Sequence, residues 1–198
     1  MNRAAWTFRT AAAALALATV TACLRPSPPV VLYTLEPLPP QVDADRPGPA
    51  LEVLPVRLPE VLRRPQLLTA QGPGRFGLDD RHRWGNPLDQ EVQRVLIADL
   101  SALLGGAPVV PSPYGARVGA AWRVDVQVQS WEERPGQGLV LVATWMLMRP
   151  GSERAERFQR TTLRVPLEGS GPDALAAAHG RAVADLAREL AEALRTSR

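Results

Sequence analysis

The sequence has few of the residues on which enzymes and metal sites most often depend. Its 198 residues include one cysteine, two histidines and no lysine, so all 23 basic residues are arginines. A single cysteine excludes an intramolecular disulfide and any metal site built from several cysteines. The sequence also contains neither a Gly-rich phosphate loop of the Walker type nor the GxSxG pattern of a serine nucleophile. We therefore expect neither enzymatic activity nor a bound metal or cofactor.

The two histidines do not suggest a catalytic pair. General acid–base catalysis most often uses a histidine that a second polar group orients. His82 stands in an arginine-rich stretch, where we predict a solvated loop residue. His179 stands in an alanine-rich helical pattern, where we predict a residue on the helix surface.

Long blocks of one charge are also absent. The 23 basic residues face 20 acidic ones, and the basic cluster closest to a patch, Arg63-Arg64, is only a pair. A surface that follows a phosphate backbone needs a longer basic block than this. We therefore expect no nucleic-acid partner. With 45% hydrophobic residues, the chain can bury one core, and a single domain is the simplest expectation.

The amino-terminal apolar run is too short to span a membrane. Two arginines precede the uncharged residues 11–22, and Cys23 follows them directly. A spanning helix needs about 20 apolar residues, so this layout predicts a secretory signal. The letters "VTAC" resemble the bacterial lipobox, whose cysteine receives a diacylglycerol and becomes the first residue of the mature protein. We predict a lipoprotein signal peptide at residues 1–22 with lipidation of Cys23. The alternative is an ordinary signal peptide with an incidental cysteine nearby.

Residues 23–29 have the composition of a tether. Their prolines lack amide donors and fix the backbone angle φ, which disfavours both a helix and a central strand. Such a spacer rises about 3.1 Å per residue and holds a domain just off a membrane surface. Leu24 follows the cysteine in place of the aspartate that retains many such lipoproteins in the inner membrane of enteric bacteria. We predict a lipid anchor in the outer membrane, on its periplasmic face.

Residues 30–198 are predicted to form one α+β domain. A period of two in apolar residues indicates a strand at 122–130, and β-rich runs indicate further strands. These strands are predicted from Val30, from Leu51, at 66–70 with a short edge segment after the following Gly-rich turn, at 139–148 and at 160–167. The segment 139–148 is apolar on both faces, which suits either a strand covered on both sides or one whose second face meets a partner.

Two amphipathic helices complete the domain. The first should be capped by Asn86, start with Pro87 and end at Gly105-Gly106. The second should begin near Asp173, after Gly171, with leucine, valine and alanine recurring at helical spacing. We predict a largely antiparallel mixed sheet with both helices packed on one face.

Several stretches together resemble one family. The letters are "YTL", "LEVLPVRLPEVLRRPQLL", "RWGNPLDQEVQRVLIADLSALL", "RVDVQVQSWEE" and "LVATWML", in this order. The ordered set is similar to the ABC-type transport auxiliary lipoproteins, the PqiC family, from about Tyr33 to the last helix. Members often carry an alanine and an acidic residue where this chain has Gly85-Asn86, so no role is inferred for a carboxylate at that place.

The resemblance implies a lipoprotein that works with an MCE-domain protein in systems thought to move lipids between the two membranes and to support envelope integrity. It would be an accessory subunit, and ATP hydrolysis would reside elsewhere. The alternative is a periplasmic lipoprotein that binds a small apolar ligand or aids envelope assembly without an MCE partner.

Three residues are predicted to bind a partner, which would be the MCE-domain protein or further copies of this chain. Arg63, Arg64 and Trp84 stand beside prolines and glycines that indicate loops. Arginine and tryptophan often dominate the binding energy of protein interfaces. The alternative is that Trp84 closes the end of the core while both arginines are solvated.

Overall fold

The computed structural model describes residues 29–40, 48–72, 74–134 and 136–197. The predicted signal peptide, the lipidation site Cys23 and residues 24–28 of the predicted tether lie outside these residues. Val31–Arg198 form one compact unit. None of the helices within the described residues is long and apolar enough to cross a lipid bilayer.

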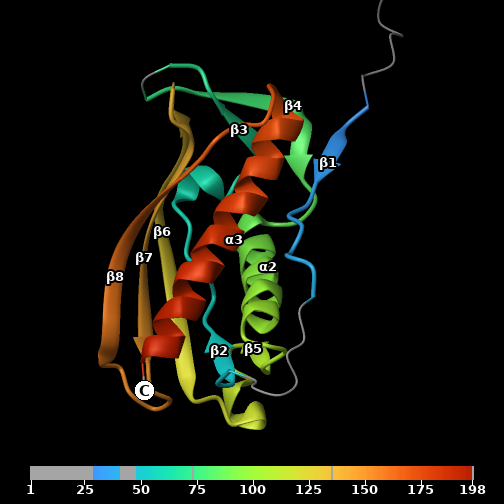
Figure 1. The fold of residues 1–198 in the computed structure, drawn as a ribbon. Helices are drawn as coiled ribbons and strands as arrows, with labels where there is room; N and C mark the ends of the chain where they lie inside the picture. The colour runs from blue at the N-terminus through green and yellow to red at the C-terminus, as the bar shows by residue number, and fades with distance from the viewer. Residues whose placement is uncertain (1–28, 41–47, 73, 135, 198) are drawn as a thin grey trace, which may run out of the picture. The chain divides into compact units, whose positions relative to one another are not determined.

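The larger sheet has five strands in the order β5-β2-β6-β7-β8 (Figure 1). The strands are β2 (Leu51–Val53), β5 (Val109–Pro111), β6 (Trp122–Arg134), β7 (Gly138–Met148) and β8 (Ala155–Val165). β2 runs parallel to both of its neighbours, whereas β6, β7 and β8 form an antiparallel meander. The meander contributes most of the sheet because its three strands are 11 to 13 residues long.

A second sheet has three strands in the order β1-β4-β3. β1 (Val31–Tyr33) pairs parallel with β4 (Phe76–Trp84), and β4 pairs antiparallel with β3 (Gln66–Ala70). The sequence predicted only a short edge segment after the Gly-rich turn, but β4 has nine residues and is the middle strand. The letters "DDRHR" in the middle of this strand are charged or polar and show no apolar alternation, and its parallel partner β1 is remote in the chain. Two short 3-10 helices, η1 (Glu60–Leu62) and η2 (Gly115–Val118), connect elements of the fold.

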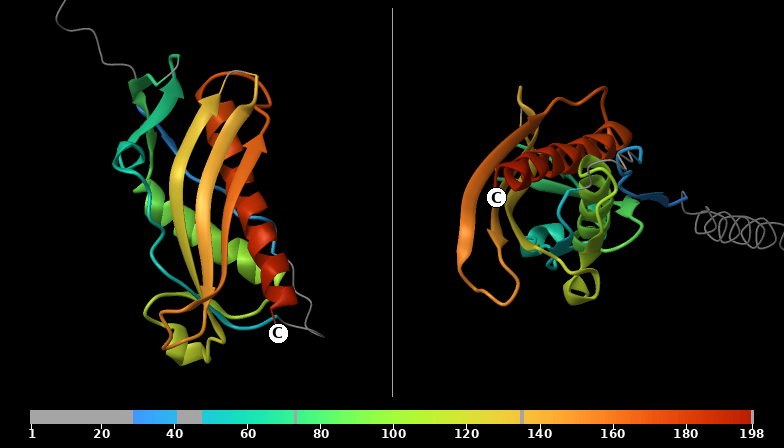
Figure 2. Two further views of the ribbon diagram at one scale, coloured as in Figure 1. Left: turned by 90° about the vertical axis from the view of Figure 1, so that its left-hand side faces the viewer. Right: turned by 60° about the horizontal axis from the view of Figure 1, so that its bottom comes forward.

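Two helices, α2 (Leu88–Leu103) and α3 (Pro172–Thr196), pack on one face of the five-stranded sheet (Figure 2). The predicted single α+β domain with both helices on one face is confirmed, although its strands form two sheets. The core is made mainly by buried side chains of the five-stranded sheet and both helices. Its largest members include Leu51, Leu96, Leu100, Leu139, Leu141, Trp145, Leu147, Leu186 and Leu190.

The ends of α2 agree only partly with the sequence. Gly105 and Gly106 have φ values of 68° and 83°, and Gly106 N donates to Ser101 O at 2.8 Å, so the predicted end is confirmed. The predicted N-cap Asn86 is wrong by one position, because Pro87 flanks the first helical residue. The Asn86 side chain instead donates from Nδ2 to Glu91 Oε1 at 2.8 Å. The Asn86 side chain, which the sequence predicted to cap the helix, therefore donates to the buried carboxylate of Glu91 instead.

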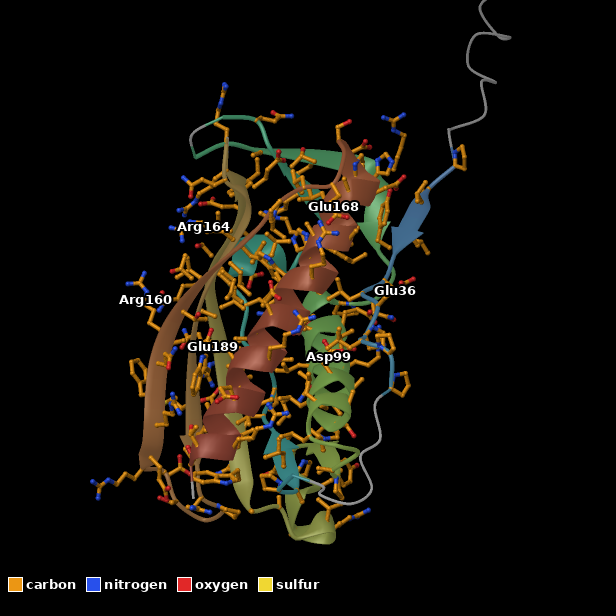
Figure 3. The ribbon with its side chains drawn as sticks, in the orientation of Figure 1. Glu36, Asp99, Arg160, Arg164, Glu168 and Glu189 are labelled. Carbon is orange, nitrogen blue, oxygen red and sulfur yellow. The ribbon has the colours of Figure 1, made fainter. Side chains whose placement is uncertain are left out.

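The meander and α3 are joined by one carboxylate. Glu189 of α3 accepts hydrogen bonds from Trp145 Nε1 of β7 at 3.1 Å, and from Gln159 Nε2 and Thr161 Oγ1 of β8 at 2.6 Å each. Figure 3 shows Glu189 between the helix and these strands. These bonds fix the inner face of β8 against α3.

Candidate functional site

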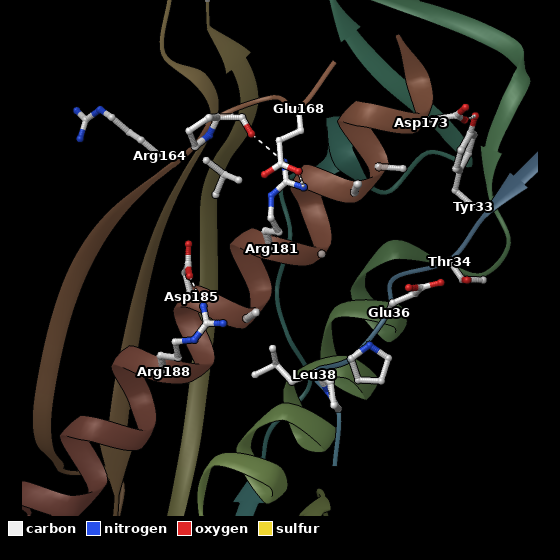
Figure 4. Close-up of a pocket in the computed structure, with 18 residues that line it drawn as sticks. Tyr33, Thr34, Glu36, Leu38, Arg164, Glu168, Asp173, Arg181, Asp185 and Arg188 are labelled. Carbon is white, nitrogen blue, oxygen red and sulfur yellow. Dashed lines mark hydrogen bonds and ion pairs between the residues drawn. The ribbon is translucent and has the colours of Figure 1, made fainter. Parts of the chain in front are cut away.

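A groove of about 680 Å³ lies beside the amino-terminal half of α3 (Figure 4). It lies between the segment 33–39, which begins at the last residue of β1, the helix itself and residues 164–168 at the end of β8. Pockets that hold small molecules typically have about 300 to 1,000 Å³. The groove therefore has the size of a ligand site, and it is open to solvent along one side.

The floor of the groove is made of small side chains. Ala176, Gly180 and Ala184 recur every four residues and so face the same side of α3. A Cβ atom added at Gly180 would lie 3.8 Å from the carbonyl oxygen of Glu36. The helix backbone and the segment 33–39 are thus separated by little more than one methyl group at this point.

The segment 33–39 is fixed to α2 by two buried carboxylates. Leu35 N donates to Glu91 Oε2 at 3.2 Å, and Leu38 N donates to Asp99 Oδ1 at 2.6 Å. Arg94 donates to the carbonyl oxygen of Leu35 at 2.7 Å. The prolines between and after these amides have no N–H group to donate. The two carboxylates accept the hydrogen bonds from the two amides, which a neighbouring strand would accept in a sheet. The position of this wall is therefore set by α2.

These two carboxylates have opposite electrostatic settings. The Arg94 guanidinium, 2.7 Å from Glu91 Oε2, holds the pKa of Glu91 below its usual range. Burial raises the pKa of Asp99, which is 0% exposed and whose Oδ2 atom has no hydrogen-bond partner among the described residues. Glu91 is thus held ionised, whereas the surroundings of Asp99 favour its neutral form.

Ion pairs and hydrogen bonds line the rim of the groove. Arg181 donates to the carbonyl oxygen of Pro166 at 2.8 Å and lies 3.6 Å from Glu168 Oε2. At the upper end, the Tyr33 hydroxyl donates to Asp173 Oδ1 at 2.6 Å. Partial burial and this carboxylate raise the pKa of Tyr33 to about 12. The hydroxyl therefore stays protonated and acts as a fixed donor.

Further along α3, Arg188 pairs with Asp185 on the side of the groove. Figure 4 shows the Arg164 guanidinium pointing away from the groove, so Arg164 contributes mainly backbone to its wall. The groove thus combines an apolar alanine floor with a rim of both charges. This arrangement suits an extended, partly apolar molecule with a polar end, and it offers no activated nucleophile. Among the described residues no group of three or more histidine, cysteine or acidic side chains could hold a metal ion.

His179 is a core residue, and its predicted place on the helix surface is wrong. It is 4% exposed and lies against Trp84 and Trp131, with ring centroids 5.3 and 4.5 Å away. Its Nδ1 atom lies 2.8 Å from the carbonyl oxygen of Leu175, which can only accept, so Nδ1 carries a proton. Burial lowers the pKa of His179 to about 4. His179 is four residues from the buried Leu175 and from the buried Val183. The helical period therefore places it on the buried face, a signal that the prediction missed.

His82 also differs from its prediction. It lies in β4 rather than in a loop, and its Nδ1 atom is 2.9 Å from Asp79 Oδ2. Hydrogen bonds from the side chain and the backbone of Arg81, together with the contact to His82, hold the pKa of Asp79 far below its usual range. The pair lies outside the groove and has a structural setting on the smaller sheet.

The three predicted partner-binding residues differ in their exposure to solvent. Trp84 is 5% exposed and belongs to the core, which agrees with the alternative that it closes the core. Arg63 and Arg64 are exposed in the turn before β3, where Arg63 donates to Glu60 Oε2 at 3.1 Å. Trp84 N donates to the carbonyl oxygen of Pro65 at 2.7 Å, so the backbones are neighbours although the indole faces inward. Partner binding by the two arginines stays a prediction.

Comparisons with known proteins identify one family model and several solved structures of the same fold. A family model described as "ABC-type transport auxiliary lipoprotein component" matches residues 33–191. A crystal structure of an uncharacterized protein is 20% identical, with a TM-score of 0.70, and the match covers 84% of this chain and 99% of that one. A protein from Xanthomonas campestris, assigned to the family DUF330, is 15% identical with a TM-score of 0.65 over 82% of this chain and 93% of that one. No curated protein sequence matches.

Proposed function

The chain belongs to the family of ABC-type transport auxiliary lipoprotein components, and we propose that it is the non-catalytic accessory subunit of an intermembrane lipid transporter. The family match over residues 33–191 carries this proposal, because it covers nearly the whole compact unit Val31–Arg198. Family membership makes the protein a lipoprotein of the bacterial envelope and a component of a transport system. The family is described by a transport role rather than by an enzymatic activity.

The finer parts of the proposal concern place and partner. The lipid on Cys23 anchors the domain in the outer membrane, at its periplasmic face, and an MCE-domain protein of the transporter is its partner. Leu24 after the cysteine supports the outer membrane. A non-enzymatic role in lipid passage is consistent with the groove, where Arg181, Arg188 and Tyr33 are paired with carboxylates and the floor is apolar.

A second candidate function is supported by the groove itself. Its volume of about 680 Å³ and its floor of Ala176, Gly180 and Ala184 could accommodate the apolar part of a ligand. In this alternative the lipoprotein binds a small apolar molecule, or aids envelope assembly, without an MCE-domain partner. The two functions differ in what accompanies the protein out of the membrane.

Native mass measurement of the protein purified from membranes in mild detergent distinguishes the two functions. The accessory-subunit proposal expects a co-purifying MCE-domain protein. Bound lipid without an MCE-domain protein would favour the second function. If crosslinking before purification also captures no MCE-domain protein, the first function is contradicted. Protein free of both would remove the groove as a ligand site and leave the transporter proposal without support.

A side chain that fills the groove should remove any ligand from it. We expect Gly180→Leu to abolish co-purifying lipid, because a Cβ at this position already lies 3.8 Å from the Glu36 carbonyl and a larger group must enter the groove. Gly180→Ala is the matched control. It adds one methyl group at ordinary contact distance and should raise the free energy of unfolding by about 0.5 to 1 kcal/mol, since alanine favours a helix over glycine. Equal lipid content in all three proteins would contradict a ligand role for the groove.

Acylation should depend on one sulfur atom. We expect Cys23→Ala to leave the protein uncleaved or soluble in the periplasm, because only the thiol can receive the diacylglycerol, and stable anchoring needs more than one acyl chain. Phase partitioning in detergent and the intact mass of the protein measure this. A variant that still enters the detergent phase with the mature mass of the original protein would disprove the lipid anchor.

A further inference from the structure

The free edge of β8 is the longest unpaired stretch of strand in the five-stranded sheet. β8 stands at the end of the strand order and pairs with β7 along its whole length, from Val165 opposite Leu139 to Ala155 opposite Met148. Within the described residues, no main-chain hydrogen bond outside that ladder involves residues 155–165. Every second amide and carbonyl of an edge strand points away from its neighbour, so this edge presents a row of unpaired donors and acceptors.

The edge is regular enough to serve as a template. The only shift of register between β7 and β8 lies between Leu147 and Met148, near the start of β8. From Arg157 to Val165 the ladder has no irregularity and no proline, and Pro166 follows immediately. Natural sheets usually shorten or bend such edges, or cover them. Nine consecutive residues of this edge have none of these protections.

The inner face of β8 is already occupied. Gln159 and Thr161 donate to Glu189 of α3, and Arg157 donates to Thr196 Oγ1 at 3.0 Å. These contacts hold the strand rigidly against the helix. A strand that pairs with β8 would therefore meet a fixed backbone, which lowers the ordering cost of association.

The outer face of β8 is basic and partly aromatic. Phe158 is 65% exposed, and Arg160, Thr162 and Arg164 follow on the same face at intervals of two. Arg160 has no hydrogen bond or ion pair among the described residues, and Arg164 has only a 3.3 Å bond to Gln137 Oε1. Figure 3 shows both arginines extending from β8 away from α3. They are about 13 Å apart along the strand.

We propose that the free edge of β8 binds, by strand addition, an extended segment of a partner protein with acidic side chains opposite Arg160 and Arg164. Main-chain hydrogen bonds would provide affinity, and the outer-face side chains would provide selectivity. The pattern required of the partner is an apolar residue opposite Phe158, a small or β-branched one opposite Thr162, and an acidic residue at each of the two arginine positions.

Charge decides between this partner and a second copy of the chain. In a full antiparallel overlap of two β8 strands, Arg160 would lie opposite Arg160, and like charges directly opposite each other destabilise a sheet. The only acidic residue of β8, Glu156, is already paired with Arg149 at 3.1 Å. An acidic segment from another protein removes the repulsion and pairs both arginines. The proposal is independent of the transporter role, since it needs no MCE-domain partner.

The test uses the full mature chain in detergent and a labelled peptide of sequence Thr-Glu-Ser-Thr-Thr-Glu-Ser-Val-Thr. Paired antiparallel to Val165 through Arg157, this peptide places its glutamates opposite Arg164 and Arg160 and its valine opposite Phe158. Fluorescence anisotropy measures binding. We expect Arg160→Glu with Arg164→Glu to weaken binding at least tenfold, because two attractive cross-strand pairs become repulsive. A peptide with lysine in place of both glutamates should bind this variant and not the original protein.

Arg117→Glu with Arg154→Glu is the matched control, since it makes the same change of charge at two exposed arginines outside the strand. We expect it to bind the acidic peptide like the original protein. Hydrogen exchange of residues 157–165 should slow at alternate amides when the peptide is added, which a purely electrostatic contact would not cause. Equal losses in both variants, or binding without this protection, would overturn the proposal. Concentration-dependent protection without peptide, together with a dimer in sedimentation, would instead identify a second copy as the occupant.

Discussion

Acidification from pH 7 to pH 4 should lower the free energy of unfolding of this domain by roughly 3 kcal/mol through one side chain, His179. Burial lowers the pKa of His179 to about 4 from a usual value of 6.5. Between these two values the unfolded chain binds a proton and the folded chain does not. Stability therefore rises with pH across this window, is complete above about pH 6.5 and is lost as the pH falls to about 4.

The measurement is urea unfolding at pH 7 and at pH 4.5 of the original protein and of His179→Phe. Phenylalanine can occupy the slot between Trp84 and Trp131 and has no proton to bind. We expect the pH-dependent loss to be about 2 kcal/mol smaller in the variant. His179→Gln is a second variant, which keeps a donor for the Leu175 carbonyl and should show the same reduced dependence. Identical pH profiles in all three proteins would contradict a buried neutral imidazole.

Asp99 should act in the opposite direction. Burial raises its pKa, so the folded state binds the proton more readily than the unfolded state. The cost of ionising this carboxyl is absent at low pH and appears as the pH rises above its unfolded value. Any stabilisation from Asp99 on acidification therefore partly offsets the loss from His179, and comparison with the His179 variants separates the two effects.

The elements that the sequence predicted correctly are those whose pattern is local. The alternation from Trp122 to Val128 identified β6, and the apolar stripe from Leu175 to Leu194 identified α3, because each face packs against a continuous core. Most of β4 was missed because its middle residues are charged and show no apolar alternation, and because the residues of β1 that pair with it lie 51 positions earlier in the sequence. Parallel pairing leaves no turn signal between the strands.

The groove could not be predicted from the sequence for a similar reason. It exists because Glu91 and Asp99, eight residues apart on one side of α2, accept the amides of Leu35 and Leu38. In the sequence these two acids lie beside the apolar stripe of the helix, three residues after Leu88 and four after Val95, but charged residues at such places are usually solvated. Only the folded chain shows that they are 2% and 0% exposed. The role of each acid depends on the amide that it binds, and Leu35 and Leu38 are more than 50 positions away in the sequence.

The surroundings of the three predicted interaction residues also depend on contacts that are remote in the sequence. The proline and glycine residues around Trp84 suggested a loop, but the indole packs against His179 at the junction of β4 and α3. Arg63 and Arg64 are exposed as predicted for either alternative, so their position alone does not distinguish solvation from partner binding.

Trp84→Ala should lower the free energy of unfolding by about 3 to 5 kcal/mol, because removal of a buried indole leaves a cavity beside His179. For a domain of this size, a loss of that order lowers the melting temperature by about 10 °C. Water that enters the cavity should also hydrate His179, so its pKa should move toward its usual value of 6.5 and the acid-dependent loss should shrink. Thermal melts followed by circular dichroism at pH 7 and pH 4.5 measure both effects together.

Arg63→Glu with Arg64→Glu is the control, since both side chains are exposed and surface substitutions usually change stability by less than about 0.5 kcal/mol. If this variant keeps its melting temperature but no longer captures an MCE-domain protein from solubilised membranes, the arginines form part of the partner surface without Trp84. If Trp84→Ala instead melts like the original protein and loses capture, the indole must reach a partner and its place in the core is wrong. The coupling to His179 makes the core role directly visible, because only a side chain packed against the imidazole can change both the melting temperature and its dependence on pH.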